Sequence, residues 1–214
     1  MPKANYEFSP FGTLDHPWIN RADTKFVKEG EPGVFHTGLV LDGADAIAFK
    51  TLVDDRADAA HAAFWETEAG QRVKKHERPL WTAFRPYVVD TDDEGNPTGH
   101  IMFKFKQNSV LRLKDGATKT LAIGIKDSKG KPVSRPVFHG SEGRIMFTVR
   151  DILTPVNPKD KSRQIGVQLA LAQVQVTKMA EREGPSFGAV DGGYEEGEAD
   201  QASQHSATDT GGDY

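Results

Sequence analysis

Alternating hydrophobic and polar positions run through much of the chain and predict β-strands. Strict alternation opens residues 101–113 (IMFKFKQNSVLRL), and further apolar-rich segments follow, separated by turn signals such as Asp127-Ser128-Lys129-Gly130. A weaker strand is expected near Gly12 to Asn20, where Pro17 interrupts the pattern. The other predicted strands are residues 33–42, 118–127, 143–152 and 165–178.

One segment has the spacing of an amphipathic helix. Residues from Ala44 to about Glu68 are rich in Ala, and Asp42 or Asp45 is available as the amino-terminal cap. Its apolar stripe consists of Phe49, Leu52, Val53, Ala57, Ala60 and Phe64. Residues 77–100 contain three Pro and an acidic run, so we expect a long connection there. Five or six strands with one helix predict a mainly β fold, a small and partly open barrel.

The end of the chain has a different composition. From Gly184 onward it is rich in Gly, Ser, Asp and Glu, contains no Lys or Arg, and shows no periodicity. Such a segment buries too little apolar surface to offset its ordering entropy, which predicts disorder. We therefore expect a binding domain over residues 1–183 and a disordered acidic tail over 184–214. The tail is either a solubiliser or a binding motif, and Tyr214 directly after Asp213 favours a motif.

Charge is distributed unevenly along the chain, although its net value is only −4. Residues 1–100 carry 11 Lys and Arg against 17 Asp and Glu, whereas residues 101–180 carry 15 against five. Residues 181–214 carry one Arg and nine acids. A basic stretch followed by an acidic end suggests a body that binds a polyanion and a tail of opposite charge.

Several classes of protein are disfavoured by what the sequence lacks. It has no Cys, which excludes a disulfide framework and cysteine-based metal or catalytic sites. No apolar run approaches the length of a membrane span, and no secretory signal is visible, so we expect a soluble intracellular protein.

Motifs of catalysis are also missing. The chain has no GxxxxGK[ST] loop, GxSxG elbow or HExxH motif. Asp90 to Glu94 faintly resembles a calcium loop or a nuclease carboxylate cluster, but the twelfth position is Ile101 and not Glu, so we interpret it as a solvated turn. The seven His are scattered, and none pairs at ligand spacing. We therefore expect no catalytic residue, no metal site and no cofactor.

The strands carry candidate nucleic-acid contacts. Alternation places Phe103 and Phe105 on one face of a strand and Lys104 and Lys106 on the other. Further basic residues on adjacent strands would repel one another unless a polyanion neutralised them, and single-stranded nucleic acid also needs exposed aromatic faces. The predicted DNA-binding residues are Trp18, Phe35, Lys104, Lys106, Arg112, Lys114, Arg150, Lys159, Lys161 and Arg163.

These features together resemble the single-stranded DNA-binding proteins of short-tailed, T-seven-like bacteriophages. The similarity runs in order along the body and ends in the acidic tail with its terminal aromatic residue. It is carried by Gly12-Thr13, Trp18-Ile19, Gly33-Val34-Phe35, the Ala-rich helix, Phe103-Lys104-Phe105-Lys106, Asp127-Ser128-Lys129-Gly130-Lys131 and Gly166-Val167-Gln168-Leu169.

The resemblance implies an OB-fold homodimer in the cytoplasm of an infected bacterial host. Such a protein coats and protects single-stranded DNA in phage DNA replication, recombination, repair and annealing. It also implies that the tail recruits the phage DNA polymerase and helicase-primase, with Asp209, Asp213 and Tyr214 as the contact residues. Two alternatives stay open: a metal-dependent nuclease or recombination enzyme that uses carboxylates of residues 90–94, and a virion or scaffold protein without DNA affinity.

Overall fold

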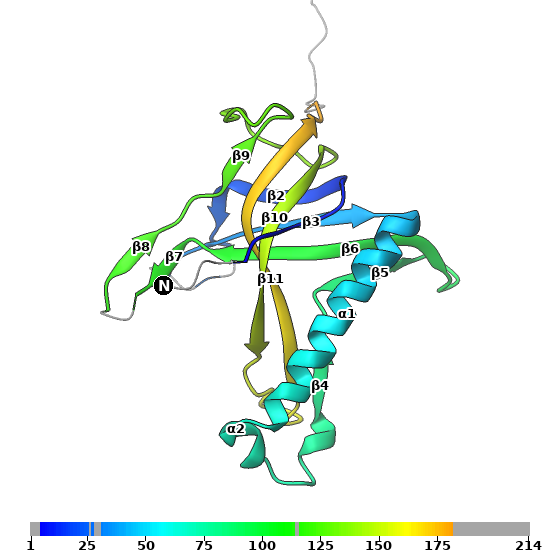
Figure 1. The fold of residues 1–214 in the computed structure, drawn as a ribbon, viewed down its shortest axis with the longest axis vertical. Helices are drawn as coiled ribbons and strands as arrows, with labels where there is room; N and C mark the ends of the chain where they lie inside the picture. The colour runs from blue at the N-terminus through cyan, green and yellow to red at the C-terminus, as the bar shows by residue number, and fades with distance from the viewer. Residues whose placement is uncertain (1–4, 26, 28–30, 114–115, 182–214) are drawn as a thin grey trace, which may run out of the picture. The chain divides into compact units, whose positions relative to one another are not determined.

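Strands dominate the computed structural model, which describes residues 5–25, 27, 31–113 and 116–181 (Figure 1). The helical elements are α1 (Gly43–Trp65), α2 (Glu68–Gln71) and the 3-10 turn η1 (Arg78–Leu80). The strands are β1 (Glu7–Phe8), β2 (Gly12–Asp23), β3 (Val34–Leu41), β4 (Trp81–Phe84), β5 (Tyr87–Thr91), β6 (Pro97–Asn108), β7 (Val110–Arg112), β8 (Thr118–Thr120), β9 (Gly124–Lys126), β10 (Glu142–Leu153) and β11 (Arg163–Lys178). No helix in the described residues is long and apolar enough to cross a bilayer. The tail predicted for 184–214 and its boundary lie outside them, so both stay predictions.

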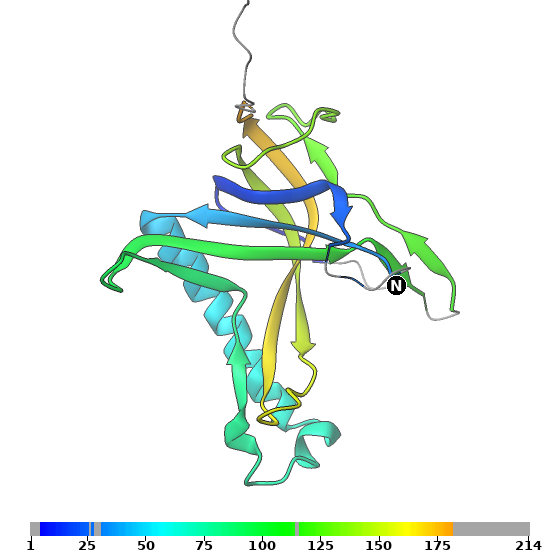
Figure 2. The same ribbon diagram turned by 180° about the vertical axis from the view of Figure 1, so that it is seen from behind.

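Five strands of the described part close into a barrel. β2 pairs with β3, β3 with β6, β6 with β11, β11 with β10, and β10 returns to β2. All these pairings are antiparallel except β6–β11, which is parallel. Figures 1 and 2 show β2, β3 and β6 crossing the β10–β11 hairpin, which extends beyond the barrel to pair with β4. The mainly β, OB-type barrel with one long helix is therefore confirmed.

The core lies inside the barrel and under α1, which packs against β11, β4 and β6. Phe103 and Phe105 are fully buried, as the alternation predicts. The ring centroid of Phe49 on α1 lies 4.7 Å from that of Phe103 and 5.7 Å from that of Phe147. Truncating a buried Phe of this kind to Ala typically costs about 3–5 kcal/mol, so this aromatic contact fixes the helix to the barrel.

Three predicted segments differ from the structure, and two of them change the sheet. Residues 77–100 do not form one long connection, because β4 pairs with β11 and β5 pairs with β6. Pro86 lies between the two strands and Pro97 begins β6, where proline costs the sheet least. The strand expected to reach residue 113 ends at Asn108, and the following β7 forms a separate two-stranded sheet with β8.

The predicted helix matches its boundaries closely, whereas the predicted strand 118–127 is divided. Asp42 is the N-cap residue of α1, although its side chain makes no capping hydrogen bond. The helix ends at Trp65, and Thr67 then caps the short α2 by accepting a hydrogen bond from the Gly70 backbone N–H at 3.1 Å. The segment 118–127 divides into β8 and β9.

Candidate nucleic-acid interface

A row of aromatic, imidazole and ammonium side chains crosses the outer face of β2, β3 and β6. Trp18 pairs with His36, and His36 pairs with Lys106. Cross-strand partners share one face of a sheet, so these three side chains are neighbours. A second row beside it holds Asp15, Gly38 and Lys104. The two rows together are called the outer face below.

The alternation predicted for β6 is confirmed. Phe103 and Phe105 are 0% and 1% exposed. Lys104 and Lys106, which alternate with them along the strand, are exposed. Their ammonium groups therefore reach solvent without disturbing the core. The sequence placed both lysines on the correct side of the barrel wall.

Neither lysine has a carboxylate at ion-pair distance among the described residues. The Lys and Arg ion pairs in that part of the chain belong to other cations, namely Lys50, Arg56, Arg72, Arg85 and Lys178. Like charges on adjacent positions of one face repel each other, and a polyanion relieves that repulsion. The outer face is therefore charged in a way that favours an anionic ligand.

Trp18 is partly buried, and its surroundings are polar. The Arg21 guanidinium lies 5.1 Å from the Trp18 ring centroid, and the His36 ring lies 6.3 Å away. His36 is in turn held by Asp23, whose Oδ2 lies 3.2 Å from its Nε2. A backbone hydrogen bond from Lys25 and the hydrogen bond with His36 lower the pKa of Asp23. An indole beside a guanidinium is suited to stacking on a base whose phosphate the guanidinium binds.

The outer face continues onto β11 and β10. Lys106 pairs with Ala170, which pairs with Thr148. Arg150 pairs with Gln168, and the Gln168 amide donates a hydrogen bond to the Lys106 carbonyl at 3.2 Å. A hollow of about 490 Å³ lies here, and its lining includes Tyr6, Leu111, Thr148, Arg150 and Ala170. The exposed Arg150 therefore joins the predicted lysines, with room for a ligand beside it.

Phe35 is a correction to the predicted site. Its side chain is 7% exposed and belongs to the hydrophobic core, because it has the same strand parity as Leu39 and Leu41. The neighbouring His36 points outward in its place. Phe35 is therefore a packing residue and offers no face for base stacking.

Four other predicted residues belong to neither row of the outer face. Arg112 is on the β7–β8 hairpin, and Lys159 and Lys161 are exposed in the loop between β10 and β11. The Arg163 guanidinium lies 5.2 Å from the Trp81 ring centroid, and its Nε donates a hydrogen bond to the Thr154 carbonyl. Arg163 therefore supports the end of the hairpin. Lys114, Asp209, Asp213 and Tyr214 lie outside the described residues.

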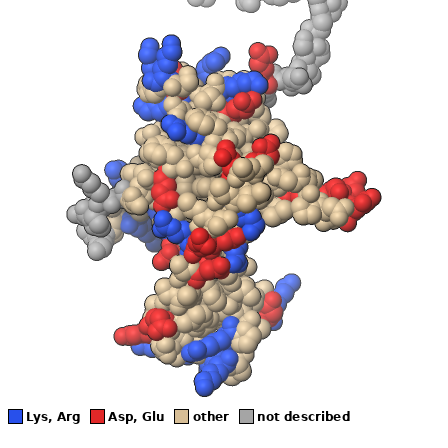
Figure 3. Space-filling model, turned by 45° about the vertical axis from the view of Figure 1, so that its right-hand side comes forward, with Lys and Arg blue, Asp and Glu red and all other residues tan. Residues whose placement is uncertain are grey.

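A second basic and aromatic group was not predicted. The Arg144 guanidinium lies 5.1 Å from the Phe8 ring centroid and 5.0 Å from that of Phe11, and both rings are more than half exposed. Figure 3 shows Lys and Arg gathered at the upper end of the molecule, where Figure 1 shows β9. The sequence holds no signal for this group, because it depends on the pairing of β1 with β10.

The charges between α1 and the β4–β5 region are mutually paired, in contrast to the outer face. Asp54 accepts hydrogen bonds from Lys50 at 2.6 Å, Arg85 at 2.8 Å and Tyr87 at 2.7 Å, and Arg85 also reaches Asp58 at 2.6 Å. Partial burial by itself would raise the pKa of Asp54. The hydrogen bonds from Lys50 and Tyr87 and the charges of Lys50 and Arg85 outweigh it and lower that pKa. Burial and the Asp54 carboxylate raise the pKa of Tyr87.

The acidic run of residues 90–94 forms the turn between β5 and β6. The Asp92 carboxylate accepts hydrogen bonds from the backbone N–H groups of Glu94 at 3.0 Å and Asn96 at 2.8 Å. These bonds lower the pKa of Asp92, that from Asn96 most. In the described part of the chain, these carboxylates do not gather with others into a ligand cluster. Their geometry is that of a hairpin turn in solvent.

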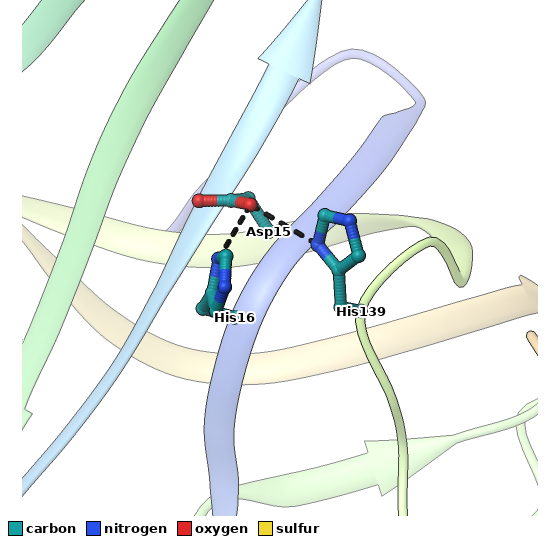
Figure 4. A group of neighbouring side chains, drawn as sticks. All are labelled: Asp15, His16 and His139. Atoms are coloured by element: carbon teal, nitrogen blue, oxygen red, sulfur yellow. Dashed lines mark hydrogen bonds and ion pairs between the residues drawn. The ribbon is translucent and has the colours of Figure 1, made fainter. Parts of the chain in front are cut away.

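Three potential metal ligands do gather elsewhere in the described residues, although the histidine spacing in the sequence did not indicate them. Asp15 Oδ1 lies 2.7 Å from His16 Nδ1 and 3.1 Å from His139 Nδ1 (Figure 4). His139 comes from the segment before β10, far from β2 in sequence. Linear spacing therefore gave no indication of this group.

Comparison with solved structures connects this fold to two phage proteins. The first is gp2.5, a single-stranded DNA-binding protein encoded by bacteriophage T7, with a TM-score of 0.60, 19% identity, and coverage of 98% of this chain and 100% of that one. The second is the single-stranded DNA-binding protein of bacteriophage Enc34 in complex with single-stranded DNA, with a TM-score of 0.50, 12% identity, and coverage of 84% and 89%. No protein-family model and no curated protein matches the chain in sequence. The chain therefore has the fold of phage single-stranded DNA-binding proteins, and the resemblance drawn from its sequence is confirmed at the level of the fold.

Proposed function

We propose that this protein binds single-stranded DNA through the outer face and does not cleave it. The observation that carries the proposal is the row of Trp18, His36 and Lys106 beside Lys104, in which both lysines lack a carboxylate partner among the described residues. An aromatic ring with adjacent cations matches the two parts of a nucleotide, a base to stack on and a phosphate to neutralise.

The same arrangement favours single strands over duplex. In a duplex the base faces are already stacked on one another, so Trp18 would gain no contact with them. The phosphates of either form would still reach Lys104, Lys106 and Arg150. We therefore expect preference for single strands to come from the stacking contact, and salt dependence to come from the cations.

The biological role we propose follows the phage proteins that share the fold. T7 gp2.5 is a single-stranded DNA-binding protein, and the Enc34 protein was solved with single-stranded DNA bound. We propose that this chain coats and protects single strands in phage DNA replication, recombination, repair and annealing. It would do so as a homodimer in the host cytoplasm.

A regulatory role is proposed for residues 184–214 on the basis of their sequence. They carry seven acids and no Lys or Arg, and tethering keeps them near the body at an effective concentration that reaches millimolar. They would compete with DNA phosphates for the basic side chains. Through Asp209, Asp213 and Tyr214 they would recruit the DNA polymerase and helicase-primase once DNA displaces them.

Deleting residues 185–214 tests the tail. The deletion changes the net charge from −4 to +3, and we expect tighter binding to poly(dT), most clearly at low salt. Removal of Tyr214 alone should weaken recruitment of replication proteins and leave DNA affinity unchanged. Unchanged DNA affinity of the truncated protein at low salt would show that the tail does not compete.

Titration with poly(dT) and with duplex DNA at several salt concentrations tests the main proposal. We expect single strands to bind more tightly, with a slope of about −0.7 per phosphate contact in a plot of log affinity against log salt. Incubation of a labelled oligonucleotide with divalent cations should leave it intact. Equal affinity for both forms, a flat salt dependence or cleavage would each overturn the proposal.

A further inference from the structure

Asp15, His16 and His139 place one carboxylate and two imidazoles around a common point on the barrel surface (Figure 4). One ligand atom from each residue lies within 4.8 Å of the others. The side chain of Asp15 is 23% exposed, and those of His16 and His139 are 77% and 64% exposed. The group is therefore open to solvent on one side and anchored by the carboxylate on the other.

An irregularity in β2 positions His16. Asp15 pairs with Gly38 and Trp18 pairs with His36, so two residues of β2 lie opposite the single residue Thr37 of β3. This is a β-bulge, a device that turns a side chain away from the regular alternation. His16 has a φ of +42°, in the left-handed region that side chains other than Gly adopt at a cost of about 1–3 kcal/mol. The strained backbone at His16 thus places its imidazole beside the Asp15 carboxylate.

Backbone hydrogen bonds hold His139 against the same bulge. The Gly140 N–H donates to the Leu14 carbonyl at 3.0 Å, and the Leu14 N–H donates to the Ser141 carbonyl at 2.8 Å. Further along β2, the Asn20 side chain accepts a hydrogen bond from the Val137 N–H at 3.0 Å. The segment carrying His139 is therefore fastened to β2 on both sides of the histidine.

We propose that these three residues form a site for a divalent transition-metal cation of the Zn²⁺ class. Two imidazoles with one carboxylate are a ligand set typical of Zn²⁺, whereas Mg²⁺ prefers oxygen ligands. Bonds of about 2.0–2.1 Å to a tetrahedral centre separate ligand atoms by about 3.3 Å. Asp15 Oδ1 lies 2.7 and 3.1 Å from the two Nδ1 atoms, and all three ligand atoms lie within 4.8 Å of one another, so rotation of the two exposed rings would bring them to this value.

The position of the site gives the cation a role that rests on the proposed DNA binding. Asp15 shares its cross-strand row with Lys104. Without a cation, its carboxylate would repel the phosphates that Lys104 attracts. A divalent ion reverses that local charge, and with three protein ligands it keeps a coordination position open to solvent. A phosphate oxygen of the bound strand would occupy that position.

Metal titration of the untagged full-length protein without DNA tests the site. Isothermal titration with ZnCl₂ should show one site per chain, and Co²⁺ should give visible absorption bands of tetrahedral coordination. We use His16→Asn, because Asn tolerates a positive φ, and His139→Gln. Each should weaken Zn²⁺ binding at least about tenfold, MgCl₂ should not bind, and the exposed control His76→Ala should behave as the wild type. Zinc binding that survives both site variants, or is absent from the wild type, overturns the proposal.

A second measurement separates this site from the DNA-binding proposal. Affinity for poly(dT) is measured in a metal chelator and again with ZnCl₂. Binding in chelator tests the outer face alone, and its loss would overturn the proposed function. Added Zn²⁺ should tighten binding several-fold in the wild type and have no effect in His139→Gln. Zinc binding without this gain would overturn the role assigned to the cation in holding phosphate.

Discussion

Two charged regions of this protein differ in whether their charges have partners. Between α1 and the β4–β5 region, Lys50 and Arg85 both donate to Asp54, and Arg85 also reaches Asp58. On the outer face, Lys104 and Lys106 have no carboxylate at ion-pair distance within the described residues. The charges of the first region are neutralised by partners within the protein, whereas those of the second region remain available to pair with a ligand.

Whether the charged side chains have partners also determines how much each region contributes to stability. The Asp54 carboxylate is 22% exposed and accepts three hydrogen bonds, so the donors around it would lose a shared acceptor if it were removed. The ammonium groups of Lys104 and Lys106 form no ion pair within the described residues, and their mutual repulsion opposes folding slightly. Substitutions in the two regions should therefore affect different measurements.

The largest expected effect follows reversal of the outer-face charges. Lys104→Glu combined with Lys106→Glu should weaken poly(dT) binding at low salt by about 100-fold, or about 2.7 kcal/mol, with little change in melting temperature. The matched control is Lys74→Glu with Lys75→Glu, which makes the same change of net charge at exposed positions after α2. Equal losses in both double variants would mean that net charge, and not the outer face, governs binding.

Neutralising the shared acceptor Asp54 in the paired region should have the next largest effect. Asp54→Asn should lower the free energy of unfolding by about 2 kcal/mol, the scale of hydrogen bonds to charged groups. Denaturant unfolding measures this, and the exposed neighbour Asp55→Asn is the control. DNA affinity should be unchanged in both. A loss of affinity in Asp54→Asn alone would show that the two regions are coupled.

Trp18→Ala should have a smaller effect, because the ring is only partly exposed. We expect poly(dT) affinity to fall by about 1 kcal/mol, the lower end of the range for stacking on a base, and duplex affinity to stay constant. Fluorescence titration measures the first and gel shift the second. Phe35→Ala is the comparison, since loss of that core ring should reduce stability. A parallel fall in duplex affinity would argue against stacking.

The smallest expected effect is the pH dependence of the paired region. The pKa of Asp54 is lowered in the folded state from its ordinary 3.8, so its contribution to stability is complete above that value. The contribution is lost as the pH falls through the lower folded-state pKa. The difference in unfolding free energy between the wild type and Asp54→Asn should therefore shrink in acid. A constant difference from pH 6 to pH 2 would contradict the assigned cause.

The sequence predicted part of the candidate site and missed its neighbours. Lys104 and Lys106 were placed correctly, because alternation with Phe103 and Phe105 fixes their face. Phe35 was placed wrongly, although its parity with Leu39 and Leu41 already indicated the core. His36 and Gln168 were missed because each gains its position from a strand that pairs with it from a distant part of the chain.

The sequence by itself determined the features that depend on local periodicity and composition. Side chains alternate along any strand, and an apolar stripe recurs along any amphipathic helix, so most strands and α1 could be predicted from the sequence. The basic segment followed from composition alone. Tertiary structure alone decided which segments meet. β4 and β5 became strands because β11 and β6 offered them partners. Strand register placed Trp18 and Lys106 on either side of His36, and a bulge and a hydrogen-bonded loop brought His139 to Asp15. Both arrangements arise only when distant segments pair.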